Sequence, residues 1–205
     1  WAPSVETRTP DAMMKNKDFL GNYQPDLTGG FGTNLRYKNI FLSMNFDFMI
    51  GGQIASFTNM WADVSGIAAK TAEINDRGVN VREPVSKGGG VHLTGVDVDG
   101  NPVDTYVGAY QFYHQNYYDA WTAMYDRTYL KMRELSFSYT LNRAQLNKWT
   151  KGAVSNASIS FVANNPWLIY SAVPNIDGSE ITHSYYEGGS VISTRSFGLT
   201  VKLGF

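Results

Sequence analysis

The stretch RSFGLTVKLGF, residues 195–205, gives the clearest indication of the fold. Its apolar residues all fall on one parity: Phe197, Leu199, Val201, Leu203 and Phe205. The residues between them are Ser196, Gly198, Thr200, Lys202 and Gly204. Strict alternation with a period of two predicts a β-strand with one apolar and one polar face.

The same alternation recurs along the chain, and it predicts strands at about 27–37, 40–50, 128–141, 156–170 and 194–205. Eleven residues at about 3.3 Å each, tilted by about 45°, span roughly 25 Å, which is the height of the apolar band of an outer-membrane barrel. The opposite faces, rich in Ser, Asn, Gly and Thr, suit a water-filled lumen. A soluble β-sandwich with one solvated face would alternate in the same way, so both alternatives stay open.

One predicted strand changes phase. Leu130 and Met132 are apolar at even positions, whereas from Leu135 onward the apolar residues are odd. A β-bulge near Arg133–Glu134 would restore a single apolar face, because one extra residue shifts the parity. Alternatively, the strand leaves the apolar layer at this point.

The connections alternate between short and long. Lys38 and Asn39 form a tight hairpin, and 142–155 is a longer turn, whereas 51–127 and 171–193 are long loops. Antiparallel order places the long loops on one side, as in barrels with short periplasmic turns and long extracellular loops. Within 51–127 we expect a helix at 58–76, weakened by Gly66, a hairpin at 88–107 and a short helix at 109–124.

Composition excludes several function classes. A net charge of −1 offers no basic field for nucleic acid. The chain has no Cys, its three His residues are far apart, and no catalytic constellation is evident, so we expect no enzyme and no metal or other cofactor. Calcium at Asp97 and Asp99 is a weaker interpretation than a plain Asp-Gly turn, because the bidentate Glu of an EF-hand is missing.

Several blocks resemble the closing part of SusC/RagA-type TonB-dependent receptors. They are PDLTGGFGTNLRYKNIFLSMNFDFMIGG from Pro25, VHLTGVDVDGNPV from Val91, DRTYLKMRELSFSYTL from Asp126 and NASISFVANNPWLIY from Asn156. The strand that ends in Phe205 also resembles a terminal barrel strand. In such a strand the final aromatic residue and the apolar residues before it, here Phe197, Leu199, Val201, Leu203 and Phe205, are the signal for barrel assembly.

The resemblance implies an all-β fold: an antiparallel transmembrane β-barrel segment with about five terminal strands of a 22-stranded barrel and long extracellular loops. It implies import of oligosaccharides, or peptides, across the outer membrane of Bacteroidota. Further implied partners are a SusD-like surface lipoprotein, outer-membrane lipid, the rest of the barrel with its plug, and TonB. We expect the plug and the TonB-contacting segment to lie outside this chain. A soluble carbohydrate-binding β-sandwich and a general porin-type barrel remain alternatives.

The candidate binding residues are chosen for their chemistry. Aromatic rings beside amide and carboxylate side chains suit sugars and peptides alike. In the loops the candidates for substrate or partner binding are Trp61, Tyr110, Tyr113, Tyr117, Tyr118, Trp121 and His183. Facing the lumen they are Asn45 and Asp47. Alternatively, the aromatic loop folds on itself and buries its rings.

Overall fold

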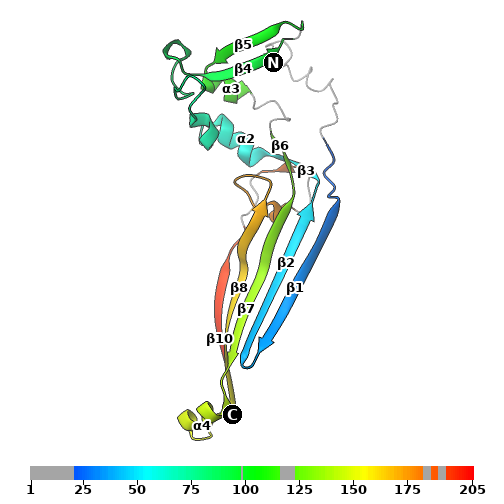
Figure 1. Ribbon diagram of the computed structural model, residues 1–205, viewed down its shortest axis with the longest axis vertical. Helices are drawn as coiled ribbons and strands as arrows, with labels where there is room; N and C mark the ends of the chain where they lie inside the picture. Colours follow the sequence, from blue (N-terminus) through cyan, green and yellow to red (C-terminus); the bar gives the residue numbers. More distant parts are fainter. Residues whose placement is uncertain (1–20, 98, 116–122, 182–185, 189–192) are drawn as a thin grey trace. The chain divides into compact units, whose positions relative to one another are not determined.

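The computed structural model describes residues 21–97, 99–115, 123–181, 186–188 and 193–205, and the chain forms two compact units (Figure 1). The sheet unit contains the described residues of 22–53, 126–181 and 193–205. The loop unit contains Gly21 and the described residues of 54–125 and 186–188.

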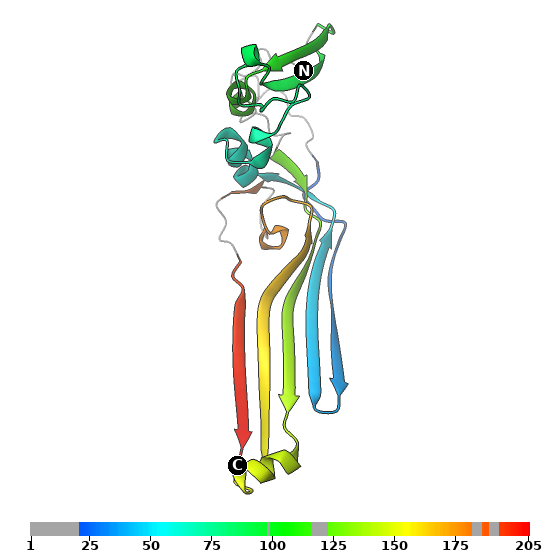
Figure 2. The same cartoon turned by 60° about the vertical axis from the view of Figure 1, so that its left-hand side comes forward.

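A five-stranded sheet with the order β1-β2-β7-β8-β10 forms the sheet unit (Figure 2). Its strands are β1 (Leu27–Tyr37), β2 (Ile40–Ile50), β7 (Tyr129–Thr140), β8 (Asn156–Ser171) and β10 (Ser196–Gly204), and every neighbouring pair is antiparallel. The ranges at 27–37 and 40–50 are those predicted, and the other three differ from the prediction by at most two residues at each end.

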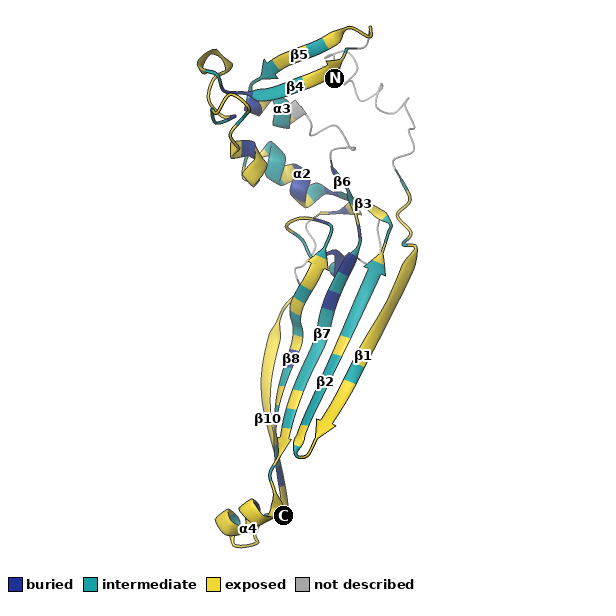
Figure 3. Ribbon diagram, in the orientation of Figure 1, coloured by how far each residue is buried: buried dark blue, intermediate teal, exposed yellow. Residues whose placement is uncertain are grey.

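The pairing register gives the sheet two faces of opposite character. On one face Leu42 lies opposite Leu35 and Phe137, and this row continues through Phe161 and Leu199. On the other face the opposed pairs are polar, as in Ser43 with Ser136 and Ser138 with Ser160, which also share a hydrogen bond of 2.7 Å. Large side chains of the apolar face remain open to the surroundings, for example Phe31 at 54% and Leu199 at 72% exposed (Figure 3).

Gly29 on β1 makes room for the Phe48 ring of β2. A Cβ atom at Gly29 would lie 2.9 Å from Cζ of Phe48, so any larger residue there would collide with that ring. Phe31 stacks on Phe46 with ring centroids 4.8 Å apart. The weak alternation of 27–37 therefore reflects close packing against aromatic neighbours rather than an absent strand.

Of the two alternatives for the phase change, the structure shows the β-bulge. Asn45 pairs with Glu134, but the next residue, Phe46, pairs with Met132, so Arg133 is the extra residue on β7. Met132 thereby returns to the apolar face beside Phe46, and the strand does not leave the sheet here.

The connection at 142–155 contains a helix that the sequence did not predict. Helix α4 (Arg143–Thr150) begins at Asn142, whose side chain accepts a hydrogen bond from the Ala144 N–H, and it ends at Lys151 in a left-handed conformation. Leu146 is its one buried residue, so an eight-residue helix leaves almost no periodic apolar pattern to recognise.

The loop unit is built on short elements, so the chain is mostly β but not entirely so. The expected hairpin is present as β4 (Val91–Val96) and β5 (Pro102–Val107), followed by α3 (Ala109–Gln115). A second small sheet has the order β6-β3-β9, formed by β6 (Met124–Asp126), β3 (Gln53–Ser56) and β9 (Tyr186–Glu187). In the described residues three 3-10 helices complete the elements: η2 (Ala69–Ala72) and η3 (Val85–Lys87) in this unit, and η6 (Gly178–Glu180) in the sheet unit.

The helix expected at 58–76 is wrong in length. Helix α2 covers only Phe57–Val64, capped at its start by Ser56, because Gly66 has a left-handed φ of +74° that no continuing helix allows. None of the helices in the described part of the chain combines the length and the apolar composition that crossing a membrane would require.

Candidate functional site

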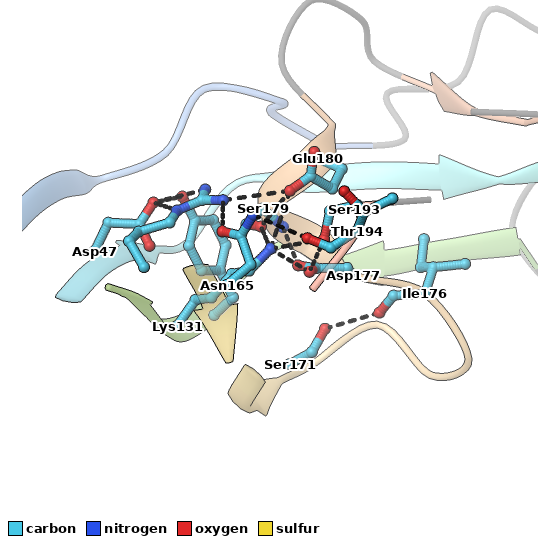
Figure 4. A network of polar contacts seen from close by, with 12 residues as sticks. Asp47, Lys131, Asn165, Ser171, Ile176, Asp177, Ser179, Glu180, Ser193 and Thr194 are labelled. Atoms are coloured by element: carbon cyan, nitrogen blue, oxygen red, sulfur yellow. Dashed lines mark hydrogen bonds and ion pairs between the residues drawn. The ribbon is translucent and has the colours of Figure 1, made fainter. Parts of the chain in front are cut away.

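A charged network lies on the polar face of the sheet unit, and we define it by Asp47, Lys131, Arg133, Asp177 and Glu180 (Figure 4). Lys131 is at its centre with a side chain only 1% exposed. Its Nζ lies 2.6 Å from Oδ2 of Asp177 and 3.0 Å from Oε1 of Glu180. Two hydroxyl oxygens, of Ser179 at 3.1 Å and Ser193 at 3.0 Å, complete its set of acceptors.

Arg133 links this cluster to strand β2. Its Nε and Nη2 donate to Oδ2 of Asp47 at 2.9 and 2.8 Å. Its Nη1 lies 3.3 Å from Oε1 of Glu180 and 3.3 Å from Oδ1 of Asn165 on β8. The bulge makes this possible, because it places Arg133 on the polar face although the following residue, Glu134, also belongs there.

The network has two cations and three carboxylates, so its net charge is −1 if all are ionised. Burial raises the pKa of Asp177, but the hydrogen bonds that it accepts from Lys131 and Ser179 outweigh burial and leave this pKa below its usual value. The pKa of Glu180 is lowered for the same reason, since the bonds from Lys131 and Arg133 exceed the effect of burial. Both carboxylates therefore stay charged at neutral pH and hold the connection that follows β8 against the sheet.

A cavity of about 700 Å³ opens beside the network. Polar side chains on its wall include Lys131, Asn165, Ser193 and Arg195, and apolar ones include Leu168 and Ile176. Ser171 donates a hydrogen bond to the Val173 carbonyl at 3.0 Å, which helps to fix the chain around the cavity. The cavity has both polar and apolar walls and is open enough for water or a small hydroxylated solute.

The two candidates predicted on the polar face lie there together. Asp47 belongs to the charged network, and Tyr129 also donates to its Oδ2 at 3.2 Å. Asn45 lies two residues before Asp47 on β2, opposite Gly32 of β1 on one side and Glu134 of β7 on the other. These contacts do not show that Asp47 or Asn45 binds substrate, so substrate binding by these two residues stays a prediction.

A second cavity, of about 450 Å³, brings together two of the predicted aromatic candidates in the loop unit. Tyr110 and Tyr113 of α3 line it together with polar side chains of Asp63, Thr71 and Arg82. Tyr110 is 77% exposed. The remaining described candidate, Trp61, is 54% exposed on α2 and does not line this cavity. Tyr117, Tyr118, Trp121 and His183 lie outside the described residues.

Hydrogen bonds fix the walls of this loop cavity. Arg82 donates to the Thr71 carbonyl at 2.9 Å and to the Thr71 hydroxyl at 2.8 Å, and it also bonds the Gly66 carbonyl. Tyr113 donates to the Lys70 carbonyl at 2.9 Å, while Lys70 pairs with Asp63 at 2.6 Å. Burial raises the pKa of the Tyr113 hydroxyl, so it remains a donor. A rigid wall with an open Tyr ring suits a ligand that offers both hydroxyl or amide groups and an apolar surface.

His92 of the hairpin lies between two carboxylates. Its Nδ1 is 2.7 Å from Oδ2 of Asp76 and its Nε2 is 2.7 Å from Oδ1 of Asp104. Its ring stacks on Tyr106 with centroids 4.5 Å apart, and Arg77 covers the Tyr106 ring. Hydrogen bonding to Asp104, followed by the charge of Asp76, raises the pKa of His92 above its ordinary value.

The Asp-Gly turn occupies the carboxylate that was considered for calcium. Asp97 accepts hydrogen bonds from the backbone N–H groups of Asp99 and Asn101, at 2.9 and 2.8 Å, and from the Asn101 side chain at 3.0 Å. These bonds lower the pKa of Asp97, the Asn101 side chain contributing most. They are the bonds of an Asx-type turn.

Sequence reasoning missed most of the charged network. Lys131, Arg133, Asp177 and Glu180 were not among the candidates, although two basic residues inside an alternating strand, next to a phase change, were a usable signal. Asp177 and Glu180 follow Lys131 and Arg133 by more than forty residues, and no local sequence pattern connects the two segments.

Comparisons with known proteins were made for sequence and for structure. No family model matches the chain. It is 29% identical over 133 residues to TonB-dependent receptor P3 of Formosa agariphila, an alignment that covers 65% of this chain and 11% of that protein.

Among solved structures the chain is similar to the RagAB peptide importer in its closed-closed state, with a TM-score of 0.58, 13% identity, and coverage of 89% of this chain and 18% of that one. The structure of the RagAB peptide transporter gives a TM-score of 0.56 at 12% identity, with the same coverage. The chain thus spans less than a fifth of the length of these relatives.

Proposed function

We propose that this chain, a fragment of a SusC/RagA-type TonB-dependent receptor, forms part of the wall of an outer-membrane β-barrel that imports nutrients. Its relatives are receptors and transporters rather than enzymes, so transport is the activity to which the segment contributes. In this proposal the apolar face of the sheet contacts lipid, the polar face lines the lumen, and the loop unit faces the cell exterior.

The opposite character of the two sheet faces carries this proposal. Phe137, Leu199 and Val201 expose large apolar side chains on one face, where water would be an unfavourable neighbour. Strands β1 and β10 form the two edges of the sheet. Closure with further strands of the same receptor would pair both edges, which is how barrels avoid open edges.

The charged network has a clear part in such a wall. Lys131 and Arg133 face the lumen and hold the connection after β8 inside the polar space by ion pairs with Asp177 and Glu180. A basic side chain on the lipid face would cost about 2–4 kcal/mol at the membrane midplane, whereas lumen-facing charges carry no such cost.

The loop cavity supports a part in substrate capture. The open ring of Tyr110 and the fixed polar groups around Tyr113 and Arg82 match an oligosaccharide, or a peptide such as the RagAB importer carries. We propose further that a SusD-like lipoprotein covers this side and that TonB, acting through a plug elsewhere in the receptor, drives release into the periplasm.

A matched pair of substitutions tests the membrane assignment. Leu199 and Thr200 are neighbours on β10 but lie on opposite faces, opposite Phe161 and Ser160 respectively. In the intact receptor, Leu199→Arg should reduce assembly and heat stability by about 2–4 kcal/mol if it lies near mid-bilayer, while Thr200→Arg should assemble normally. Equal behaviour of the two variants, or a water-soluble receptor that needs no detergent, would contradict the proposal and favour a soluble sandwich.

A further inference from the structure

The end of the sheet that carries the short connections has an unusual charge. This turn end comprises the hairpin 37–40 and the connection 141–155, with helix α4 beside the last residue of β10 (Figure 2). Between Glu134 and Asp177 the chain has no acidic residue, yet it has Arg143, Lys148 and Lys151. Together with Lys38 these form four cations in two adjacent turns, which we call the basic turn cluster.

The basic turn cluster is exposed and not neutralised from within. All four side chains lie on the surface. The ion pairs found in the described part of the chain involve Lys70, His92, Lys131 and Arg133, and none reaches this cluster. Its positive charge is therefore available to an external anionic partner.

Two of the four basic residues, both lysines, stand where the backbone disfavours them. Lys38 has a φ of 51° and Lys151 a φ of 53°, both in the left-handed region that glycine or asparagine adopts more easily. Glycine or asparagine would fit both left-handed positions with less backbone strain, so the turn geometry does not account for a lysine at either of them.

Large aromatic side chains accompany the cations. Trp149 of α4 is 69% exposed, and Tyr37, the last residue of the apolar row on β1, is 68% exposed. Lys38 lies over the Tyr37 ring at 5.2 Å from its centroid. Tryptophan and tyrosine next to basic side chains, at the margin of an apolar surface, are typical of a protein surface that meets lipid headgroups.

We propose that the basic turn cluster, with Trp149 and Tyr37, binds the headgroups of anionic phospholipids at the periplasmic margin of the membrane. The occupant is argued from charge complementarity and from continuity with the exposed apolar face, and this inference rests on the proposed function. The phosphates meet Lys38, Arg143, Lys148 and Lys151, while the two aromatic rings insert at the level of the headgroups and glycerol.

The test uses the intact receptor in detergent and a fluorescent phosphatidylglycerol, with phosphatidylcholine as the uncharged competitor. The receptor should prefer phosphatidylglycerol, and 0.5 M salt should weaken this preference. Lys38→Asn should lower the affinity about fivefold, and the combined Lys38→Asn, Arg143→Gln, Lys148→Gln and Lys151→Asn variant should lose the preference. Lys87→Gln, an exposed lysine of the loop unit, serves as the control and should change nothing.

The design separates lipid binding from folding and from the wider proposal. Asparagine fits a left-handed position better than lysine, so Lys38→Asn should not destabilise the turn. A wild-type receptor without any preference for phosphatidylglycerol, or a fourfold variant that retains it, would overturn this inference. So would a fourfold variant that binds lipid normally but loses a periplasmic protein partner. Failure of the membrane assignment itself would instead appear as equal behaviour of the Leu199 and Thr200 variants.

Discussion

Lys131 Nζ and Asp177 Oδ2 lie 2.6 Å apart, and this buried ion pair joins β7, the middle strand of the sheet, to a residue 46 positions later in the chain. The side chain of Lys131 is 1% exposed and that of Asp177 15%. A buried ammonium needs all of its partners, because removal of one leaves an uncompensated charge away from water. The pair therefore fixes where the connection after β8 begins its return to β10.

Lys131→Met should destabilise the receptor by about 3–5 kcal/mol, because Asp177 and Glu180 lose their shared cation. Urea unfolding of the receptor in lipid vesicles measures this loss. The double variant Lys131→Met with Asp177→Asn should regain part of it, since one unpaired carboxylate is removed as well. A single variant as stable as the wild type would show that the network does not hold this connection.

Insertion of one further residue beside Arg133 should prevent assembly more severely than substitution of Arg133 itself. The one extra residue already present keeps Leu130 and Met132 on the apolar face, and a second one would turn them to the polar face and Lys131 to the apolar face. Arg133→Gly keeps the bulge and loses only the contacts to Asp47, Glu180 and Asn165. Protease resistance of the assembled barrel distinguishes the two. Equal assembly of both variants would mean that the bulge does not set the register.

The hairpin at His92 should loosen as the pH rises. The pKa of His92 is raised by its hydrogen bond to Asp104 and then by the charge of Asp76. Protonated His92 therefore stabilises the hairpin fully below the unfolded-state pKa of about 6.5, and this stabilisation is lost as the pH rises through the folded-state pKa. Hydrogen exchange of residues 91–107 in the intact receptor measures this change. His92→Gln should remove the dependence of the protection factors on pH, and a wild-type hairpin with equal protection factors at pH 6 and pH 9 would contradict it.

Tyr110→Ala should weaken substrate uptake about two- to tenfold, which is the range expected for one aromatic contact. Assembly should be unchanged, because Tyr110 is 77% exposed and supports little of the fold. Ile67→Ala is a suitable control, since Ile67 is 80% exposed in the same unit but does not line the cavity. Uptake that falls equally in both variants, or in neither, would exclude a role for the loop cavity.

The sheet could be predicted from the sequence because the patterns that define its strands lie within short stretches of the chain. Alternation and the two-residue turn at Lys38 and Asn39 define β1 and β2, and the parity change on either side of Arg133 located the bulge. Helix α4 was not predicted because Leu146 is its one buried residue and gives no periodic pattern. Helix α2 was predicted too long, although Gly66 already indicated a weak point in the expected helix.

The candidate site could be predicted only in part. Tyr110 and Tyr113 were identified from their chemistry, and the fold places them around one cavity. The pairing of Lys131 with Asp177 and Glu180 depends on where a long connection returns to the sheet. That path is set by tertiary packing, and a single sequence contains no periodic signal for it.

The central claim is that the sheet stands in the membrane with its apolar face toward lipid, and cysteine accessibility tests it most directly. The chain has no cysteine of its own, so single replacements can be placed along β10 and β7 of the intact receptor, in a background without other reactive thiols. A membrane-impermeant thiol reagent should label positions 198, 200 and 202 and spare 197, 199 and 201. The same alternation should appear at 136 and 138 against 135 and 137. Uniform labelling of both faces, or stronger labelling of the apolar face, would contradict the account.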